Sequence, residues 1–376
     1  MSEAEKSHIV LVAASMRMGG AERMTLNLAV EFARRGHRVD LVLIDRTGPL
    51  LERIPAGVGV IGLGGTRARG VVRQLRRYLR RQRPAAVLSI AFQTNILTML
   101  ASLGLRPRPR IILSVRNAYS AAMAANPFIT RRLFGLATRL LYPRADRIVG
   151  ISQGCSDDLR RHAGLDPDHV ATIYNPVLDD EFERLAAEPL NPSRADDPAI
   201  PTVVTVGRLA VQKDQATLLR AFAKVVRQRP ARLVLVGEGE RRPALEALAG
   251  ELGIADQVTF AGLQPNPYPL MREADLFVLS SAWEGFGNVL VEAMAVGTPV
   301  VSTDCPHGPR EILEDGKWGG LVPPGDSDAL AEAMLEALRS GGIDARERAR
   351  HFTVARAADQ YLSLMLDEPV REAGPG

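Results

Sequence analysis

Short apolar stretches alternate with amphipathic stretches along this 376-residue chain, and this alternation constrains the fold more than any other feature. The apolar runs 8–14, 38–44 and 85–90 have the length of buried strands, whereas residues 21–35 and 71–83 repeat their apolar side chains at helical spacing. Strands buried on both faces and separated by helices form parallel sheets. The first half is therefore expected to be a doubly wound parallel α/β sheet.

The rhythm stops around residues 178–200, where prolines and charges dominate, and restarts at Pro201. The length of the chain also favours two domains over one. The sequence predicts an N-terminal domain over residues 1–178, a linker over 179–200, a second α/β domain over 201–355, and a C-terminal helix and tail over 356–376 that cross back to the first domain.

The ends and the cysteines narrow the class of protein. The first residues are partly acidic and precede only a short apolar run, so neither a signal peptide nor a spanning helix is expected, and the predicted location is the cytoplasm. Cys155 and Cys305 are far apart and belong to no Cys-x-x-Cys or Cys/His cluster. Neither a disulfide framework nor a zinc site is therefore expected.

Residues 67–83 contain eight arginines and no acidic residue, and Val71, Leu75 and Leu79 form one helical stripe among them. Two interpretations stay open. The basic face could rest on anionic lipid headgroups, or it could be the solvated side of a helix that covers the sheet. Nucleic acid is not an expected partner, because only Tyr78 interrupts the run with an aromatic ring and no DNA-reading motif occurs.

Two glutamates eight residues apart mark the strongest candidate site. Glu284 follows a predicted strand and precedes the turn Gly285-Phe286-Gly287, after which Asn288 opens a helix. The free N–H groups of a helix N-terminus bind phosphate, and Glu292 in the next turn could accept hydrogen bonds from a ribose diol. Either glutamate alone would be an ordinary surface charge, but the strand, glycine turn and helix around the pair favour a nucleotide site.

Two further segments that follow predicted strands contain candidate ligand-binding residues. The first includes two cations, Arg208 in Thr205–Leu209 and Lys213 in Gln212–Asp214. They could neutralise a departing diphosphate, although in isolation they would be surface charges. Gly19 and Gly20 follow the first strand, where glycine lets the backbone approach a ligand. Neither the Gly-x-Gly-x-x-Gly nor the P-loop pattern occurs, which disfavours nicotinamide and P-loop chemistry.

Together these segments resemble the retaining glycosyltransferases of family 4, with their E-x7-E motif and GT-B fold of two Rossmann-like domains facing each other across a cleft. The resemblance covers nearly the whole chain, including Val236–Gly239, Phe260–Gly262 and Ala145–Val149. It implies transfer of a hexose or N-acetylhexosamine from a nucleotide diphosphate sugar, with UDP favoured and GDP the alternative. The implied acceptor is a hydroxyl of a glycan or lipid-linked glycan in cell-surface polysaccharide biosynthesis.

The resemblance also implies roles. Glu284 would hold hydroxyls of the donor sugar, and Arg208 and Lys213 would steady the diphosphate. The residues implied for donor binding are Gly19, Gly20, Gly237, Gly262, Gly285, Phe286, Gly287, Asn288, Val289 and Glu292. No metal and no cofactor beyond the sugar nucleotide are expected.

One segment departs from the family. Many relatives carry a histidine after the strand that corresponds to residues 111–115, but here the chain reads Ser114-Val115-Arg116-Asn117. Arg116 is assigned to the catalytic site, where it or Asn117 could contact the donor phosphate, the sugar or an anionic acceptor. An ordinary structural ion pair is the other interpretation of Arg116.

Arginine-rich apolar segments of the first half, with Leu133, Phe134 and Leu140 near Arg131, Arg132 and Arg139, suggest peripheral contact with the inner face of the membrane. A buried helix explains the same residues equally well. Two rival functions remain: a sugar-nucleotide epimerase of the same fold, and a non-catalytic protein that binds sugar nucleotides.

Overall fold

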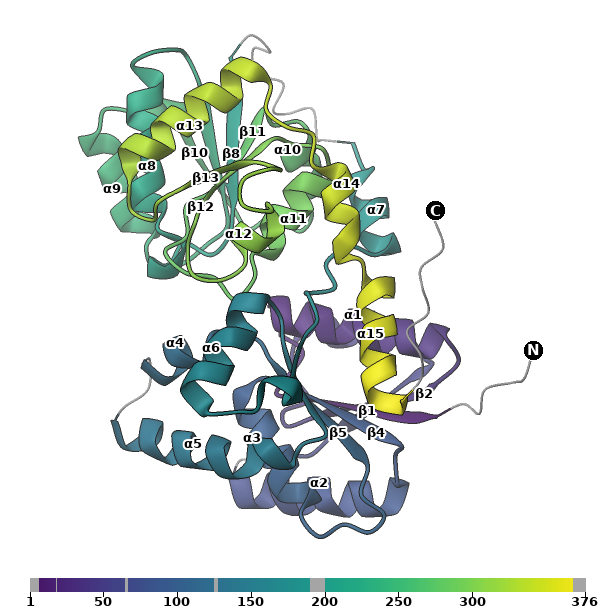
Figure 1. Cartoon of the computed structure of the whole chain (residues 1–376). Coiled ribbons are helices and arrows are strands. Elements are labelled where there is room, and N and C mark those ends of the chain that lie inside the picture. The colour runs from purple at the N-terminus through teal and green to yellow at the C-terminus, as the bar shows by residue number, and fades with distance from the viewer. Residues whose placement is uncertain (1–6, 18, 65–66, 125–127, 190–199, 368–376) are drawn as a thin grey trace. The chain divides into compact units, whose positions relative to one another are not determined.

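The structure, a computed structural model, describes residues 7–17, 19–64, 67–124, 128–189 and 200–367. The chain divides into two compact units. Unit 1 consists of Met1–Pro176 with Thr353–Gly376, and unit 2 consists of Val177–Phe352. Each unit contains one parallel sheet covered by helices (Figure 1).

Unit 1 has a seven-stranded parallel sheet in the order β3-β2-β1-β4-β5-β6-β7. The strands are β1 (His8–Ala13), β2 (Arg38–Leu43), β3 (Val58–Gly62), β4 (Ala86–Ile90), β5 (Arg110–Val115), β6 (Arg147–Gly150) and β7 (Val170–Thr172). The helices are α1 (Gly20–Arg34), α2 (Ala68–Gln82), α3 (Phe92–Ser102), α4 (Tyr119–Ala124), α5 (Phe128–Leu141), α6 (Gln153–Ala163) and α15 (Val354–Leu366). No helix among the described residues has the length and apolar character needed to cross a bilayer.

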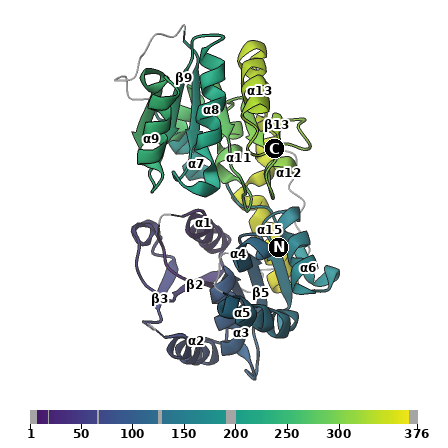
Figure 2. The same cartoon turned by 90° about the vertical axis from the view of Figure 1, so that its left-hand side faces the viewer.

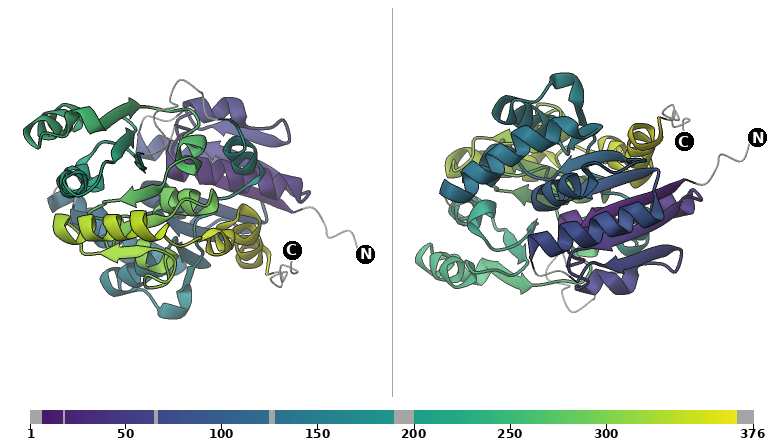
Figure 3. Two further views of the ribbon diagram at one scale, coloured as in Figure 1. Left: turned by 90° about the horizontal axis from the view of Figure 1, so that it is seen from above. Right: turned by 90° about the horizontal axis from the view of Figure 1, so that it is seen from below.

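The side chains of β1 alternate between two hydrophobic clusters, one on each face of the sheet. Ile9 and Leu11 pack with α1 and α15, while Val10 and Val12 pack with α2 and α3 on the other face. Helices α2, α3 and α5 follow one another across that second face (Figures 2 and 3). Apolar residues on both faces of a strand are what parallel sheets require, so the sequence pattern and the layered packing agree.

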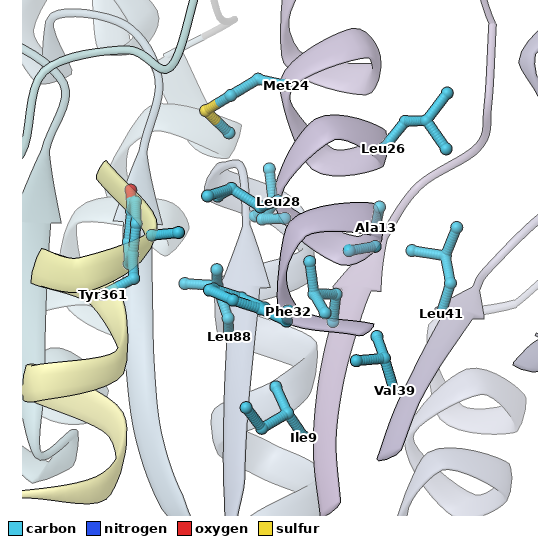
Figure 4. Packing of buried hydrophobic residues seen from close by; sticks show 14 of the residues in the cluster. Ile9, Ala13, Met24, Leu26, Leu28, Phe32, Val39, Leu41, Leu88 and Tyr361 are labelled. Atoms are coloured by element: carbon cyan, nitrogen blue, oxygen red, sulfur yellow. The ribbon is translucent and has the colours of Figure 1, made fainter. Parts of the chain in front are cut away.

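The C-terminal helix α15 is part of the core of unit 1. Figure 4 shows Leu28 and Phe32 of α1 facing Leu88 of β4, with Tyr361 of α15 alongside. Arg35 at the end of α1 adds polar contacts to α15, because it pairs with Asp359 and donates from Nη2 to the carbonyl of residue 355 at 2.8 Å. Unit 1 is therefore completed by a segment that follows unit 2 in the chain.

Unit 2 has a six-stranded parallel sheet in the order β10-β9-β8-β11-β12-β13. The strands are β8 (Thr202–Val206), β9 (Arg232–Val236), β10 (Val258–Gly262), β11 (Leu276–Leu279), β12 (Val300–Thr303) and β13 (Gly320–Val322). The helices are α7 (Asp180–Ala186), α8 (Gln215–Val226), α9 (Arg242–Glu251), α10 (Tyr268–Arg272), α11 (Asn288–Ala295), α12 (Pro309–Ile312), α13 (Ser327–Ser340) and α14 (Arg346–Ala349). The expectation of two doubly wound parallel sheets is confirmed.

Several elements of the structure are not predicted from the sequence. Among them are β3, β7 and β13, which are outer strands of the sheets, where partial exposure weakens the apolar pattern. The sequence also predicts a linker over residues 179–200, whereas residues 180–186 form α7 in unit 2. Asp179 caps α7, and Phe182 packs on Tyr268 of α10 with ring centroids 4.6 Å apart. Residues 190–199 lie outside the described part of the chain.

Phe32 provides a test of the core of unit 1. Its ring is fully buried between α1 and the sheet, so Phe32→Ala should lower the free energy of unfolding of unit 1 by roughly 3–5 kcal/mol. Leu133→Ala should change it by less than about 0.5 kcal/mol, because that side chain is 63% exposed.

Urea unfolding followed by circular dichroism would measure both variants. Both tryptophans, Trp283 and Trp318, belong to unit 2, so their fluorescence reports separately on that unit. Equal unfolding midpoints for the two variants would contradict the assignment of Phe32 to the core.

Candidate active site

The strand order of unit 2 reverses between β8 and β11. From β8 the chain proceeds outward through β9 to β10, and from β11 it proceeds the other way through β12 to β13. The loops that leave these two neighbouring strands therefore diverge, and in open α/β sheets ligands bind outside the carboxyl ends of the strands at such a point. The residues that follow β8 and β11 form the candidate site of unit 2.

Lys213 and Glu284 meet at this point. Lys213 Nζ lies 2.5 Å from Glu284 Oε1, which also accepts a hydrogen bond from Ser281 Oγ at 2.6 Å. The Glu284 side chain is only 7% exposed and that of Lys213 19%. This short contact fixes both side chains where the loops leave β8 and β11.

Backbone contacts fix the two loops to each other. Ala282 N donates to the carbonyl of Gln212 at 2.8 Å, and Ser280 Oγ donates to the carbonyl of Lys213 at 2.8 Å. Asp214 adopts a left-handed conformation and caps α8, accepting from Thr217 Oγ1 at 2.7 Å. Lys213 is thus presented by a helix start whose geometry does not depend on the ion pair.

Arg208 lies at the same strand end but is exposed. Its carbonyl accepts a hydrogen bond from the buried Gln215 side chain at 3.0 Å, which orders its backbone. Within the described part of the chain no carboxylate forms an ion pair with the Arg208 guanidinium. The side chain can therefore reach an anionic ligand without first breaking an internal salt bridge.

Glycines allow the loops after β8, β9 and β10 to stack closely. Gly237 has φ +138°, and a Cβ there would lie 2.0 Å from the carbonyl oxygen of Gly207. Gly207 N donates to Val236 O at 2.9 Å, and Gly237 N donates to Gly262 O at 2.8 Å. Gly262 has φ +67°. These glycines therefore extend the backbone ladder past the strand ends, beside the Lys213 loop.

Glu292 and the preceding glycine turn lie at the start of α11. Gly287, with φ +103°, is the N-cap residue and leaves that helix end without a side-chain cap; Asn288 and Val289 form its first turn. Glu292 is 7% exposed in the second turn. Phe286 is buried against Phe352 with ring centroids 5.4 Å apart, so its side chain supports the turn from behind.

Two residues near Glu284 are not predicted from the sequence: Ser281, which donates a hydrogen bond to it, and Cys305, whose thiol its charge influences. Burial, together with the negative charge of Glu284, raises the pKa of Cys305 to about 12, so its thiol stays neutral near Glu284 at physiological pH. Neither residue belongs to a recognisable motif, and their proximity to Glu284 follows only from the fold.

Unit 1 places its own predicted residues at the carboxyl edge of its sheet. Gly19 is the extended N-cap residue of α1 and accepts from Arg23 N at 3.0 Å, while Gly20 begins the helix. A Cβ on Gly19 would lie 2.3 Å from Glu22 Oε2, so that carboxylate folds back over the glycine. Met18, the residue before these glycines, lies outside the described residues.

Arg116 directly follows β5 and is buried, with 8% exposure. It contacts the hydroxyl of Tyr361 on α15, a residue that the sequence analysis did not connect with the site. Burial lowers the pKa of Arg116 to about 10, and the charge of Glu22 and the neighbouring Tyr361 and Cys155 partly offset this effect. The guanidinium is still protonated at neutral pH. The structural ion pair proposed as an alternative role is not found in the described part of the chain.

Each half of the chain matches a profile of a known glycosyltransferase family. The family profile described as Glycosyltransferase Family 4 matches residues 18–181, and the profile described as Glycosyl transferases group 1 matches residues 200–340. The chain belongs to glycosyltransferase family 4. The family predicted from the E-x7-E segment is thereby confirmed.

Two similar proteins each match part of the chain. The chain is 32% identical over 233 residues to the N-acetylgalactosamine-N,N'-diacetylbacillosaminyl-diphospho-undecaprenol 4-alpha-N-acetylgalactosaminyltransferase of Campylobacter jejuni, covering 60% of this chain and 62% of the relative. It is 35% identical over 185 residues to the lipopolysaccharide core biosynthesis glycosyltransferase LpsE of Rhizobium meliloti, covering 47% of this chain and 53% of the relative. The aligned part is thus less than two thirds of either relative.

A solved structure supports the fold. The chain superimposes on HepE of Anabaena, solved in complex with UDP, with a TM-score of 0.77 over 96% of this chain and 100% of that one, at 22% sequence identity. The GT-B fold class is confirmed. Among the described residues of this family 4 chain, no group of three or more His, Cys, Asp or Glu side chains is placed to hold a metal ion.

The close stacking of the loops at Gly237 can be tested by adding a methyl group. Gly237→Ala should destabilise unit 2 by roughly 1–3 kcal/mol or more, because the Cβ would collide with backbone at an unfavourable positive φ. Gly250→Ala in α9, where a Cβ meets nothing within 4 Å, should be neutral or stabilise by up to about 1 kcal/mol. Tryptophan fluorescence during urea unfolding would compare them; a Gly237→Ala midpoint at or above wild type would contradict the close stacking.

Proposed function

We propose that this chain is a retaining glycosyltransferase that moves a hexose or N-acetylhexosamine from a nucleotide diphosphate sugar to a hydroxyl of a glycan or lipid-linked glycan in cell-surface polysaccharide biosynthesis. The observation that carries the proposal is the buried Lys213–Glu284 pair at the strand reversal of unit 2, next to exposed Arg208 and the start of α11. Family membership supports the same chemistry.

In the proposed reaction, the bond between the anomeric carbon and the diphosphate oxygen breaks while a bond from that carbon to the acceptor oxygen forms on the same face of the sugar. The acceptor proton passes to an oxygen of the leaving diphosphate. Arg208 and Lys213 stabilise the negative charge that grows on the diphosphate, which lowers the barrier because the cations are already in place. No separate nucleophile or metal ion is required in this scheme.

Glu284 and Lys213 would change partners when the donor binds. Without ligand each neutralises the other at 2.5 Å. A bound diphosphate competes for the Lys213 ammonium, which frees Glu284 Oε1 to accept hydrogen bonds from donor hydroxyls while Ser281 still orients the carboxylate. The N-terminus of α11, which carries the partial positive charge of the helix dipole, would face phosphate oxygens, and Glu292 would hold the ribose.

The names of similar proteins support the proposed donor and acceptor classes. HepE of Anabaena was solved with UDP, which supports UDP as the donor nucleotide here, with GDP as the alternative. The Campylobacter relative is named for a diphospho-undecaprenol glycan and LpsE for lipopolysaccharide core biosynthesis. Both names support a lipid-linked glycan as the acceptor.

Nucleotide release from a panel of UDP- and GDP-sugars with lipid-linked glycan acceptors tests the proposal. Lys213→Ala should lower kcat by roughly 10²–10³-fold with a smaller change in donor KM, because the charge on the diphosphate grows toward the transition state. Glu292→Ala should mainly raise donor KM, because a contact with the ribose is equally strong in the bound ground state and in the transition state. Lys224→Ala is the control: Lys224 pairs with Asp328 on the surface of the same unit at 2.6 Å.

Several outcomes would contradict the scheme. A Lys213→Ala variant that changed only KM would remove the proposed role of Lys213, with Trp283 fluorescence showing that the fold is retained. Conversion of one sugar nucleotide into its epimer without release would establish the rival epimerase. Tight nucleotide binding without turnover of any donor would indicate a binding protein.

Peripheral contact with the inner face of the membrane is part of the same proposal. Leu133, Leu136 and Leu140 occupy one face of α5 and are 63%, 57% and 52% exposed. On α2, Arg73, Arg77 and Arg81 line a groove of about 820 Å³. The leucines of α5 and the arginines of α2 lie on helices that cover the same face of the sheet, with α3 between them, and exposed leucines and cationic side chains both suit an anionic lipid surface.

Flotation with vesicles containing anionic phosphatidylglycerol should recover the protein at low salt and less of it at high salt. Replacing Arg73, Arg77 and Arg81 with Gln should weaken binding by roughly a hundredfold at about 1 kcal/mol per charge, and Leu136→Asp should weaken it at both salt concentrations. Leu263→Asp, at an exposed position of unit 2, is the control. Absence of flotation at low salt would contradict membrane contact.

A further inference from the structure

Arg116 carries a buried charge that pairs with no carboxylate in the described part of the chain. The side chain is 8% exposed, and its Nε and Nη1 atoms have no hydrogen-bond partner. Within the described residues it forms no ion pair, and its identified polar contact is the Tyr361 hydroxyl. Leaving a buried donor unsatisfied costs about 1–3 kcal/mol, and more when the group is charged.

The surroundings hold this guanidinium in place. Tyr361 Oη also lies 3.4 Å from Ser114 Oγ, and the Ser114 carbonyl accepts from Asn95 Nδ2 at 3.0 Å. Tyr361 therefore links α15 to the carboxyl end of β5, where Arg116 begins the loop. A residue that is buried and braced in this way cannot turn out to solvent to satisfy its N–H groups.

Helix α6 favours an anion near Arg116. Cys155, which acts electrostatically on Arg116, lies in the first turn of α6, an 11-residue helix whose N-terminus carries partial positive charge. Glu22, in the first turn of α1, also acts on Arg116 and partly opposes a second anion, but among the described residues it forms no ion pair with the guanidinium. One anionic oxygen at Arg116 would satisfy donors that the protein leaves open.

We propose that Arg116 is the anchor of an anion subsite in unit 1 that binds a phosphate oxygen of a substrate, and that Tyr361 is the residue that positions it. The existence of this subsite is independent of the glycosyl transfer proposed above. Which substrate brings the phosphate rests on that proposed function: the nucleotide diphosphate of the donor and the diphosphate of a lipid-linked acceptor share this chemistry.

Inorganic phosphate is the first probe, used with the full chain. The double variant Arg208→Ala, Lys213→Ala is the background for the further substitutions and is called the parent. It lacks the two cations proposed to bind diphosphate in unit 2. Adding Arg116→Gln should weaken phosphate binding, measured by calorimetry, by about tenfold or more, as expected for loss of a charged hydrogen bond. Adding Arg108→Gln, which removes a partly exposed surface arginine paired with Asp146, should not.

Thermal stability and a Tyr361 variant distinguish a phosphate-binding role of Arg116 from a structural role. Because Arg116 is unpaired, Arg116→Met should leave the Tm of unit 1 unchanged or raise it while abolishing the rise in Tm caused by phosphate. Tyr361→Phe should weaken phosphate binding severalfold at nearly unchanged Tm. Arg116→Lys keeps the charge and should retain part of the binding if Arg116→Gln fails to fold.

Two further titrations, with Arg116→Gln made in the otherwise wild-type chain, identify the source of the phosphate. Weaker UDP binding would assign the subsite to the donor, whereas unchanged UDP binding with weaker binding of a short prenyl diphosphate would assign it to the acceptor. Equal phosphate affinity with and without Arg116→Gln in the parent would overturn the subsite, even if transferase activity were established. Conversely, a confirmed phosphate subsite in a chain without transferase activity would leave the inference standing.

Discussion

Parallel pairing of every strand in the two sheets is the constraint on which the rest of this structure depends. It brings the carboxyl ends of the strands to one edge of each sheet, so the loops that follow the strands share that edge. In unit 2 those loops continue the backbone ladder, through Gly207 N to Val236 O and Gly237 N to Gly262 O. A side chain at position 237 would collide with the Gly207 carbonyl, which explains why glycine stands at that position.

The two units manage buried charge differently. In unit 2, Lys213 and Glu284 neutralise each other, so that site is stable without ligand and an anionic ligand must compete for the ammonium. In unit 1, Arg116 has a tyrosine hydroxyl rather than a carboxylate as its contact. Its neighbours fix its position without cancelling its charge. A group of this kind is better suited to gain free energy from a bound anion, because no internal ion pair has to be broken first.

Much of the fold could be predicted because its signals are local. Buried strands such as β1 and β9 are unbroken apolar runs, and α1 and α8 repeat apolar side chains at helical spacing. The strands β3, β7 and β13 have no such signal, since they lie at sheet edges and are partly exposed. The sequence predicts a linker where α7 forms, because the stability of α7 comes from the Asp179 cap and from Phe182 packing on Tyr268, a residue distant in the sequence.

The sequence by itself determined the family, the two doubly wound sheets, and the charged residues and glycines at the strand ends, because these depend on residue type and spacing within short segments. Only the tertiary structure decided that Lys213 bonds Glu284 across 71 residues, and that Tyr361 reaches Ser114 across 247. It also decided that Arg116 is buried without a carboxylate. Such contacts depend on where separate strands and helices come together, and no local periodicity encodes that placement.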